Sequence, residues 1–151
     1  MAFAVRRHPE AFSNGQAKGK KRPRERDRDH LGWLATLPCV ITGSRPADVA
    51  HIRFADPVYG KRETGKAEKP DDRWCLPLCR RLHDEQHKGD ERQFWARHGL
   101  DPLRIALALS GVSGDDEQAF VILREAWRTV NSTRLWQPSG NPDAFDSSEG
   151  A

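Results

Sequence analysis

The sequence predicts a small α+β protein, and two observations lead to that prediction. Short apolar runs between residues 39 and 78 alternate with polar residues or are β-branched, which is typical of strands. From residue 80 onward, apolar residues recur at helical spacing between capping and stop signals. The 151 residues suit one domain, and with 36% apolar against 31% charged residues its core should be small.

The N-terminal half is expected to begin with a helix and then a hairpin. Residues 29–37 predict one short helix, which Pro38 ends because the residue before a proline disfavours helical geometry. The runs 39–43 and 48–54 then read as two strands joined by a turn-like linker. Their pairing would form a β-hairpin that ends near His51.

A long polar loop separates this hairpin from the next predicted strand. Residues 55–72 contain two glycines and two prolines, and loops of this length in a small domain are usually functional or disordered. Alternation predicts a strand at 73–78, and residues 80–88 predict a short helix. The loop is therefore interpreted either as a solvated segment or as a flap that contacts DNA, with equal weight.

Further helices are expected toward the C-terminus. Asp90 and Gln93 resemble a capping box that opens a helix over 89–99, and Gly99 fits its stop. Asp101-Pro102 opens another helix. A last helix over 111–130 is expected to pack on the domain through an apolar stripe at helical spacing, formed by Ala119, Leu123, Ala126, Trp127 and Val130.

Charge is distributed unevenly along the chain. Residues 1–30 hold nine Lys or Arg against four Asp or Glu, whereas the net charge of the whole chain is only +3. Residues 1–28 are expected to be a disordered basic arm, because they have little to bury. The arm is either a solubilising tail or, as we favour, a segment that binds phosphates through Lys20, Lys21 and Arg22. Residues 131–151 are expected to be a flexible tail.

Composition also bears on the compartment. No stretch is long and apolar enough for a membrane span, and no apolar secretory core follows the N-terminal charges, so a cytoplasmic protein is expected. Three cysteines are an odd number, and in a reducing compartment they favour metal ligation over disulfides.

The segment Pro77–Gly89 is the most informative motif of the chain. It places Cys79, His83 and His87 at four-residue intervals. In a helix, residues four apart lie on one face, so the two imidazoles could hold one metal ion. Another histidine, His51, lies upstream at the end of the predicted hairpin.

The order of hairpin, long loop, strand and histidine-bearing helix resembles the HNH, or His-Me finger, endonucleases. Within that group the chain is most similar to the phage Ref-type recombination-enhancement nucleases. The resemblance spans roughly residues 37–109 and rests on the segments PCVITG (38–43), VAHIR (49–53), YGKRETG (59–65), EKPDDRW (68–74), PLCRRLHDEQH (77–87) and ERQFWARHGLDPL (91–103). It implies a ββα-metal core within residues 29–110.

The resemblance also implies roles for individual residues. His51 would be the general base, and His83 and His87 would be metal ligands. Asp72 stands where such nucleases often carry an Asn or Asp, so it would orient His51 or ligate the metal, with Asp71 as an equally placed rival. Hydrolysis of a phosphodiester needs an activated water and a cation on the phosphate, which a neutral histidine and a divalent metal can supply.

The chain departs from the HNH pattern at two places. Ala50 stands where many members have a metal ligand directly before the base, and Thr42 replaces the second cysteine of a zinc knuckle that begins at Cys39. Four thiolates are unavailable, but Cys39, Cys75 and Cys79 with one histidine could still form a mixed zinc site. The metal is therefore expected to be Zn, or Mg or Mn if Asp72 contributes an oxygen.

These features together predict a metal-dependent DNA endonuclease of phage or prophage type, which hydrolyses phosphodiester bonds in the bacterial cytoplasm. The resemblance adds a recombinase filament as a candidate partner, and no membrane partner is expected. The alternative is a noncatalytic zinc-stabilised module that binds nucleic acid. In either case the expected phosphate contacts are Lys61, Arg62 and Lys66 of the loop and Arg80 and Arg81 of the helix.

Overall fold

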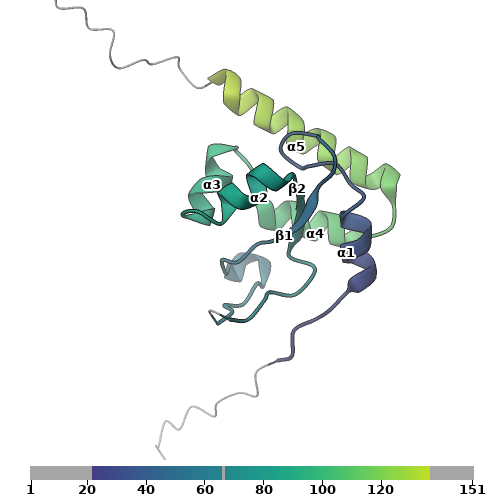
Figure 1. Cartoon of the computed structure of the whole chain (residues 1–151), viewed down its shortest axis with the longest axis vertical. Coiled ribbons are helices and arrows are strands. Elements are labelled where there is room, and N and C mark those ends of the chain that lie inside the picture. Colours follow the sequence, from purple (N-terminus) through teal and green to yellow (C-terminus); the bar gives the residue numbers. More distant parts are fainter. Residues whose placement is uncertain (1–21, 66, 137–151) are drawn as a thin grey trace, which may run out of the picture.

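The computed structural model describes residues 22–65 and 67–136 and confirms the mixed α+β class (Figure 1). The predicted phosphate-binding residues Lys20, Lys21 and Lys66 lie outside this range, as do the ends of both predicted tails. The elements are α1 (Arg28–Leu34), β1 (Asp48–His51), a 3-10 helix (Pro57–Tyr59), β2 (Cys75–Leu78), α2 (Arg80–Gln86), α3 (Glu91–Arg97), α4 (Pro102–Gly111) and α5 (Asp116–Trp136).

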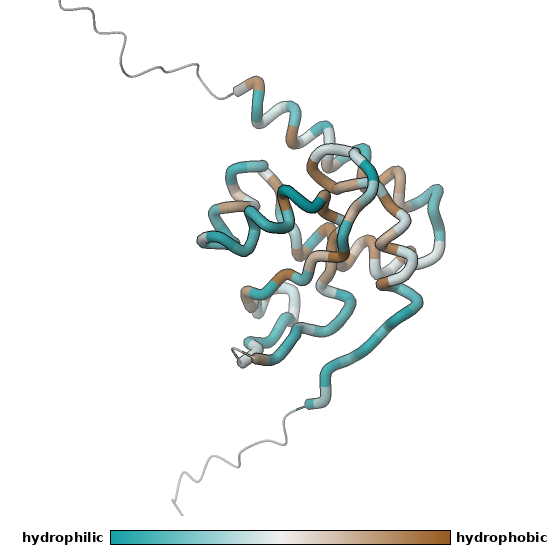
Figure 2. Tube along the Cα trace, viewed as in Figure 1, coloured by the Kyte–Doolittle hydropathy of each residue, from teal (hydrophilic) through white to brown (hydrophobic). Residues whose placement is uncertain are grey.

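The sheet consists of β1 and β2 alone, paired antiparallel with Asp48 opposite Leu78 and His51 opposite Cys75. All four residues of β2 are buried, and helices α1 and α4 contact this strand. Helix α2 lies against β1. Figure 2 shows the apolar segments gathered where these elements meet, with polar chain around them.

The predicted hairpin between residues 39–43 and 48–54 is wrong. Residues 40–42 form a turn, in which the N–H of Cys39 donates to the carbonyl of Ser44 and the N–H of Gly43 donates to the carbonyl of Cys39. Gly43 has a φ of 72°, a left-handed conformation that a continuous strand does not adopt. One backbone bond, from Val40 to Pro77, ties this turn to β2, and β2 takes the place that the hairpin partner was expected to fill.

The helical half follows the sequence prediction more closely. The Asp90 carboxylate caps α3 by accepting from the N–H groups of Arg92 and Gln93, and Gly99 follows the helix with a φ of 69°. The predicted apolar stripe of α5 is buried at Ala119, Leu123, Ala126 and Val130, and Trp127 is half-buried with its indole N–H on the Cys39 carbonyl.

Helix α5 continues to Trp136, beyond the predicted end at Val130. Its last turns are held by a contact with the turn after α3, where Thr133 lies against Gly99. A Cβ atom at Gly99 would meet the Thr133 hydroxyl at 2.2 Å, so the helix and the turn can approach this closely only because residue 99 is glycine. Sequence periodicity did not reveal this contact because Thr133 is not apolar.

Part of the predicted N-terminal arm has a defined place. Residues 22–27 run alongside residues 71–73 before α1 begins, and Figure 1 shows this segment approaching α1 from the side of the long loop. The N–H of Asp72 donates to the carbonyl of Glu25, the N–H of Glu25 donates to the Asp71 carboxylate, and Arg73 pairs with Glu25 at 2.9 Å. Within the described ranges, no helix combines the length and the apolar character that a membrane span requires.

The contact between Gly99 and Thr133 predicts that Gly99→Ala destabilises the protein. A left-handed conformation costs an L-residue about 1–2 kcal/mol, and the clash with Thr133 should add to that loss in the free energy of unfolding. The measurement is urea unfolding followed by circular dichroism.

Gly114→Ala is the matched control, because Gly114 has a φ of 88° and nothing lies within 4 Å of its would-be Cβ. Gly99→Ala should cost more than Gly114→Ala, and Thr133→Ala should remove part of the difference. Equal losses for the two glycine variants would show that the contact with α5 contributes nothing.

Candidate active site

The antiparallel ladder brings His51 and Asp72 together. His51 is the last residue of β1, and the N–H of the next residue, Ile52, donates to the carbonyl of Trp74. This bond extends the pairing toward the turn that precedes β2, where Asp72 lies. The Nε2 atom of His51 is 3.3 Å from Oδ1 of Asp72. Two residues that the sequence analysis assigned to one site therefore are neighbours, 21 positions apart in the chain.

The Asp72 carboxylate is buried and surrounded by donors. Its side chain is only 3% exposed, its Oδ2 accepts from the N–H of Asp27 at 2.9 Å, and its Oδ1 accepts from the guanidinium of Arg24. Burial by itself would raise the pKa of Asp72, but the Asp27 N–H, Arg24 and His51 hold that pKa below its ordinary value. Asp72 is therefore a fixed negative charge at neutral pH.

His51 is held neutral by its surroundings. Burial lowers the pKa of His51, the positive charge of Arg24 lowers it further, and Asp72 opposes both. The Nε2 atom faces both Asp72 and Arg24, whose Nη2 lies 3.3 Å away. Among the residues that the structure describes, none forms a hydrogen bond with the other ring nitrogen, Nδ1. A neutral imidazole with one free nitrogen has what a general base requires.

His83 of α2 and His87, the C-cap residue directly after that helix, form a second pair of histidines. Their rings have centroids 4.9 Å apart and are tilted by 44°, as the four-residue spacing predicts. Burial and the charges of Arg53 and His83 lower the pKa of His87, so this ring is neutral at neutral pH. Helix α2 is tied to the end of β1 by Gln86, whose amide donates to the carbonyl of His51 at 3.2 Å.

Asp48 orients one of these rings. Its Oδ2 lies 3.2 Å from Nδ1 of His83 and also accepts from Arg80 at 3.3 Å. A carboxylate on Nδ1 keeps the proton of the neutral ring on that nitrogen and leaves the Nε2 lone pair for a ligand. Asp48 is thereby placed behind the ring, on the side away from the free Nε2.

Across residues 22–65 and 67–136, no three His, Cys, Asp or Glu side chains are arranged as a ready metal site. The donor set of His83 and His87 nevertheless suits a divalent ion, since the two rings lie side by side and Nδ1 of His83 faces a carboxylate. Two protein nitrogens would leave the remaining coordination positions to water and phosphate oxygens. Ala50, at the position of the absent third ligand, is fully buried.

The cysteines are divided between two environments. Cys39 and Cys79 are neighbours, because the backbone N–H of Cys79 donates to the Cys39 sulfur. Burial would raise the pKa of Cys39, but that bond and those from Thr42 and Ile41 bring it below its ordinary value. Cys75 is buried in β2, and burial raises the pKa of its thiol. The Cys39 sulfur thus lies near the backbone of Cys79, and Cys75 lies in a separate buried environment.

The predicted phosphate-binding residues have different fates. Lys61 is 3% exposed and its ammonium donates to the carbonyl of Arg53, so it is not available to DNA and that prediction needs correction. Burial also lowers the pKa of Lys61. The remaining described cations, Arg22, Arg62, Arg80 and Arg81, are partly or well exposed and each pairs with a carboxylate of this chain.

Arg24 is the site residue that sequence reasoning missed. It lies in the segment RPRERDRD, where alternating charge reads as a solvated arm and nothing singles out one arginine. Its place beside Asp72 depends on the backbone pairing between residues 22–27 and 71–73, which no local pattern predicts.

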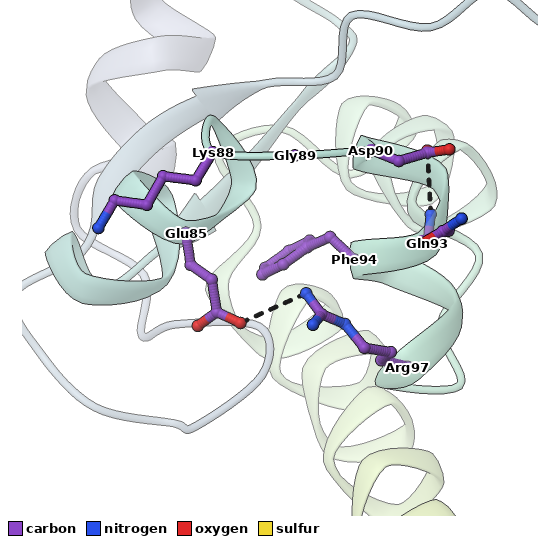
Figure 3. A pocket seen from close by; sticks show the side chains of 7 residues that line it. All are labelled: Glu85, Lys88, Gly89, Asp90, Gln93, Phe94 and Arg97. Carbon is purple, nitrogen blue, oxygen red and sulfur yellow. Dashed lines mark hydrogen bonds and ion pairs between the residues drawn. The ribbon is translucent and has the colours of Figure 1, made fainter.

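A separate cavity of about 290 Å³ lies between α2 and α3 (Figure 3). Its lining combines both charge signs: Arg97 pairs with Glu85 at 3.4 Å, and Lys88 and Asp90 lie nearby. On helix α2, Glu85 lies two positions from His83 and so points away from the histidine face. This cavity is therefore distinct from the site at the end of β1.

Comparison with known proteins gives one family and one distant relative. The family described as "Protein of unknown function (DUF968)" matches residues 9–111. The protein described as "Uncharacterized protein YdfU" from Escherichia coli (strain K12) is 35% identical over 79 residues, which are 52% of this chain and 20% of that protein. This chain thus matches about a fifth of that relative's length. No solved structure matches the chain.

The histidine environments predict how stability depends on pH. Burial is the largest effect in lowering the pKa of His30, His51, His87 and His98, so the folded protein resists protonation of these rings. The unfolded chain binds those protons from about pH 6.5 downward, and the free energy of unfolding should therefore fall as the pH drops from 7 to 5.

Urea titrations at several pH values would measure this loss. Stability should be nearly constant between pH 7 and 8, where the rings are neutral in both states. A free energy of unfolding that rises from pH 7 to 5 would contradict the burial of neutral histidines.

Proposed function

Since this chain belongs to the DUF968 family, whose description assigns no function, we propose its function from its own residues: it is a metal-dependent DNA endonuclease. The proposal rests on one juxtaposition. The His51–Asp72 pair stands at the end of β1, and the His83–His87 pair stands in and directly after α2, the helix whose Gln86 bonds the carbonyl of His51. A base on this strand and a pair of metal-binding nitrogens on the helix bonded to it are the parts that phosphodiester hydrolysis requires.

In this proposal His51 is the general base. In the neutral ring, Nε2–H donates a hydrogen bond to Asp72. The lone pair is then on Nδ1, where it can take a proton from the attacking water. The buried negative charge of Asp72 then stabilises the imidazolium that forms. The low pKa of His51 keeps the ring unprotonated, and therefore active, at neutral pH.

His83 and His87 would hold the divalent ion, which supplies positive charge to the phosphate and to the departing oxygen when bound. Asp48 positions His83 by accepting a hydrogen bond from its Nδ1–H. The exposed arginines Arg80 and Arg81, in the first turn of the same helix, would contact the DNA backbone after releasing their carboxylate partners.

The biological setting follows from the resemblance to the phage Ref-type nucleases. We infer a phage or prophage enzyme that acts on DNA in the bacterial cytoplasm, with a recombinase filament as its candidate partner. Contacts to the phosphate backbone would position the DNA without reading its sequence, so cleavage should show weak sequence preference.

A noncatalytic zinc-stabilised module that binds nucleic acid is the second candidate. The observation in its favour is that the Cys39 sulfur lies near the backbone N–H of Cys79, in surroundings that lower the pKa of the Cys39 thiol. Thiolates are preferred zinc ligands, and His83 lies one helical turn from Cys79. In this case His51 has no chemical task.

The nuclease proposal predicts metal-dependent cutting of DNA that depends on His51 and His83. Purified protein, treated with a chelator, is incubated with single-stranded, duplex and branched DNA after addition of Mg, Mn or Zn. His51→Gln should lower the cleavage rate by on the order of 10²–10⁴-fold, the usual contribution of a general base. His83→Gln should also abolish cutting, because one of two metal-binding nitrogens is lost.

His98→Gln is the matched control, because His98 packs against Phe94 on α3 and takes no part in the proposed site. It should cut like the unmodified protein. No cutting with any metal, together with DNA binding and zinc affinity that Cys39→Ser removes, would replace the nuclease by the zinc module.

The role given to Asp48 predicts a change in metal affinity. Asp48→Ala removes the acceptor behind His83 and should weaken Zn²⁺ binding by about 10–100-fold, the usual effect of losing such a partner. Asp48→Asn should lose less, because its amide oxygen still accepts from Nδ1. Isothermal titration calorimetry with Zn²⁺ measures both variants.

Asp84→Ala is the control for charge, since Asp84 also pairs with Arg80 but forms no bond to His83. If Asp48→Ala binds Zn²⁺ as tightly as Asp84→Ala, Asp48 does not position the ligand.

A further inference from the structure

Two groups compete for one nitrogen of the proposed base. Nε2 of His51 lies 3.3 Å from Oδ1 of Asp72 and 3.3 Å from Nη2 of Arg24. Asp72 can only accept a hydrogen bond, and Arg24 can only donate one. Nε2 must carry a proton to bond Asp72 and must lack one to bond Arg24, so the neutral ring can satisfy only one of them at a time.

The choice between the two partners decides which nitrogen is the base. If Nε2 donates to Asp72, the lone pair is on Nδ1, the nitrogen with no partner among the described residues. If Nε2 accepts from Arg24, the proton is on Nδ1, and that nitrogen cannot take a proton from water. Arg24 therefore opposes the tautomer that the proposed mechanism needs.

Arg24 is also incompletely bonded where it lies. Its side chain is 21% exposed, and its Nε is buried without a hydrogen-bond partner. A buried donor without a partner carries a free-energy cost that a new acceptor would relieve. The guanidinium shares Oδ1 of Asp72 with His51, so both cationic and neutral donors converge on one oxygen.

A phosphate is the acceptor that fits this arginine. Guanidinium groups bind phosphate oxygens in pairs, through donors that include Nε. Arg24 also belongs to a chain segment whose other basic residues are expected to contact the DNA backbone. A phosphate entering beside His51 could thus satisfy Nε and draw the guanidinium from the imidazole.

We propose that Arg24 is a substrate-responsive switch on the tautomer of His51. The proposal rests on the nuclease function argued above and adds its regulation. Without DNA, Arg24 bonds Nε2 and favours the inactive Nδ1–H form. When a DNA phosphate binds Arg24, the Nδ1 proton leaves to solvent and a solvent proton adds to Nε2, and the new Nε2–H donates a hydrogen bond to the Asp72 carboxylate. The net charge of the ring is unchanged, and the base is formed only when substrate is present.

The test is an NMR measurement of the His51 ring nitrogens in the full chain at neutral pH, with EDTA present so that nothing is cut. Two-bond and three-bond ¹H–¹⁵N correlations distinguish the Nδ1–H from the Nε2–H tautomer. The samples are unmodified protein, Arg24→Gln and Arg128→Gln, each alone and with a saturating 12-base-pair DNA duplex. Arg128→Gln removes the same charge from helix α5, at a side chain that is 78% exposed and has no place in the proposed site.

Without DNA, the unmodified protein and Arg128→Gln should show mainly the Nδ1–H tautomer of His51. With the duplex, both should show mainly the Nε2–H tautomer. Arg24→Gln should show Nε2–H in both samples. If Arg24→Gln without DNA shows the same His51 tautomer as the unmodified protein, then Arg24 does not compete with Asp72 for Nε2, and the proposal is wrong. A duplex that binds the unmodified protein and leaves its tautomer unchanged would overturn the role of phosphate.

Cleavage assays distinguish failure of the switch from failure of the nuclease. If the unmodified protein cuts DNA but either NMR result above is negative, the switch is wrong and the nuclease stands. If the duplex does not bind and no metal supports cutting, the proposed function fails and the switch fails with it. The comparison of unmodified protein with and without the duplex needs no substitution. A folding defect in Arg24→Gln therefore cannot decide the outcome.

Discussion

The register of the short ladder between β1 and β2 is the constraint on which the rest of the site depends. Side chains alternate between the two faces of a strand, so Asp48 and His51, three residues apart, point to opposite faces. Asp48 meets His83 of α2, and His51 meets Asp72 before β2. A slip of one residue in this pairing would turn the side chains of Asp48 and His51 to the other faces and remove both contacts.

The exposed arginines expected to contact DNA are already paired with carboxylates of the same chain. This holds for Arg80 and Arg81 of α2 and for Arg22 of the N-terminal segment. Such surface pairs are individually weak, so a polyanion can displace them at little cost. The proposed contacts with DNA would therefore exchange partners on these arginines, and their strength should depend on salt.

The sequence allowed correct prediction of those features of the fold that depend on residues close together in the chain. The helical periodicity of α5, the Asp90 cap and the four-residue spacing of His83 and His87 all depend on neighbours within one or two turns. The strand predicted at 39–43 failed because β-branched residues also suit a buried turn, and only the glycine after them marked the difference. Arg24, Asp48 and the burial of Lys61 depend on contacts between distant segments, which one sequence does not display.

Residues 22–27, which precede α1, belong to the proposed functional unit, so that unit begins before the first helix. The histidines and the carboxylate at position 72 lie within the segment that any motif built on strands and helix would capture. The guanidinium and the Asp27 N–H that hold this carboxylate come from residues that precede the first helix. A shortened chain that starts at α1 would keep every motif residue and still leave a buried anion without two of its donors. Boundaries drawn from the motif alone would thus cut through the site, and the family match, which begins at residue 9, includes the missing segment.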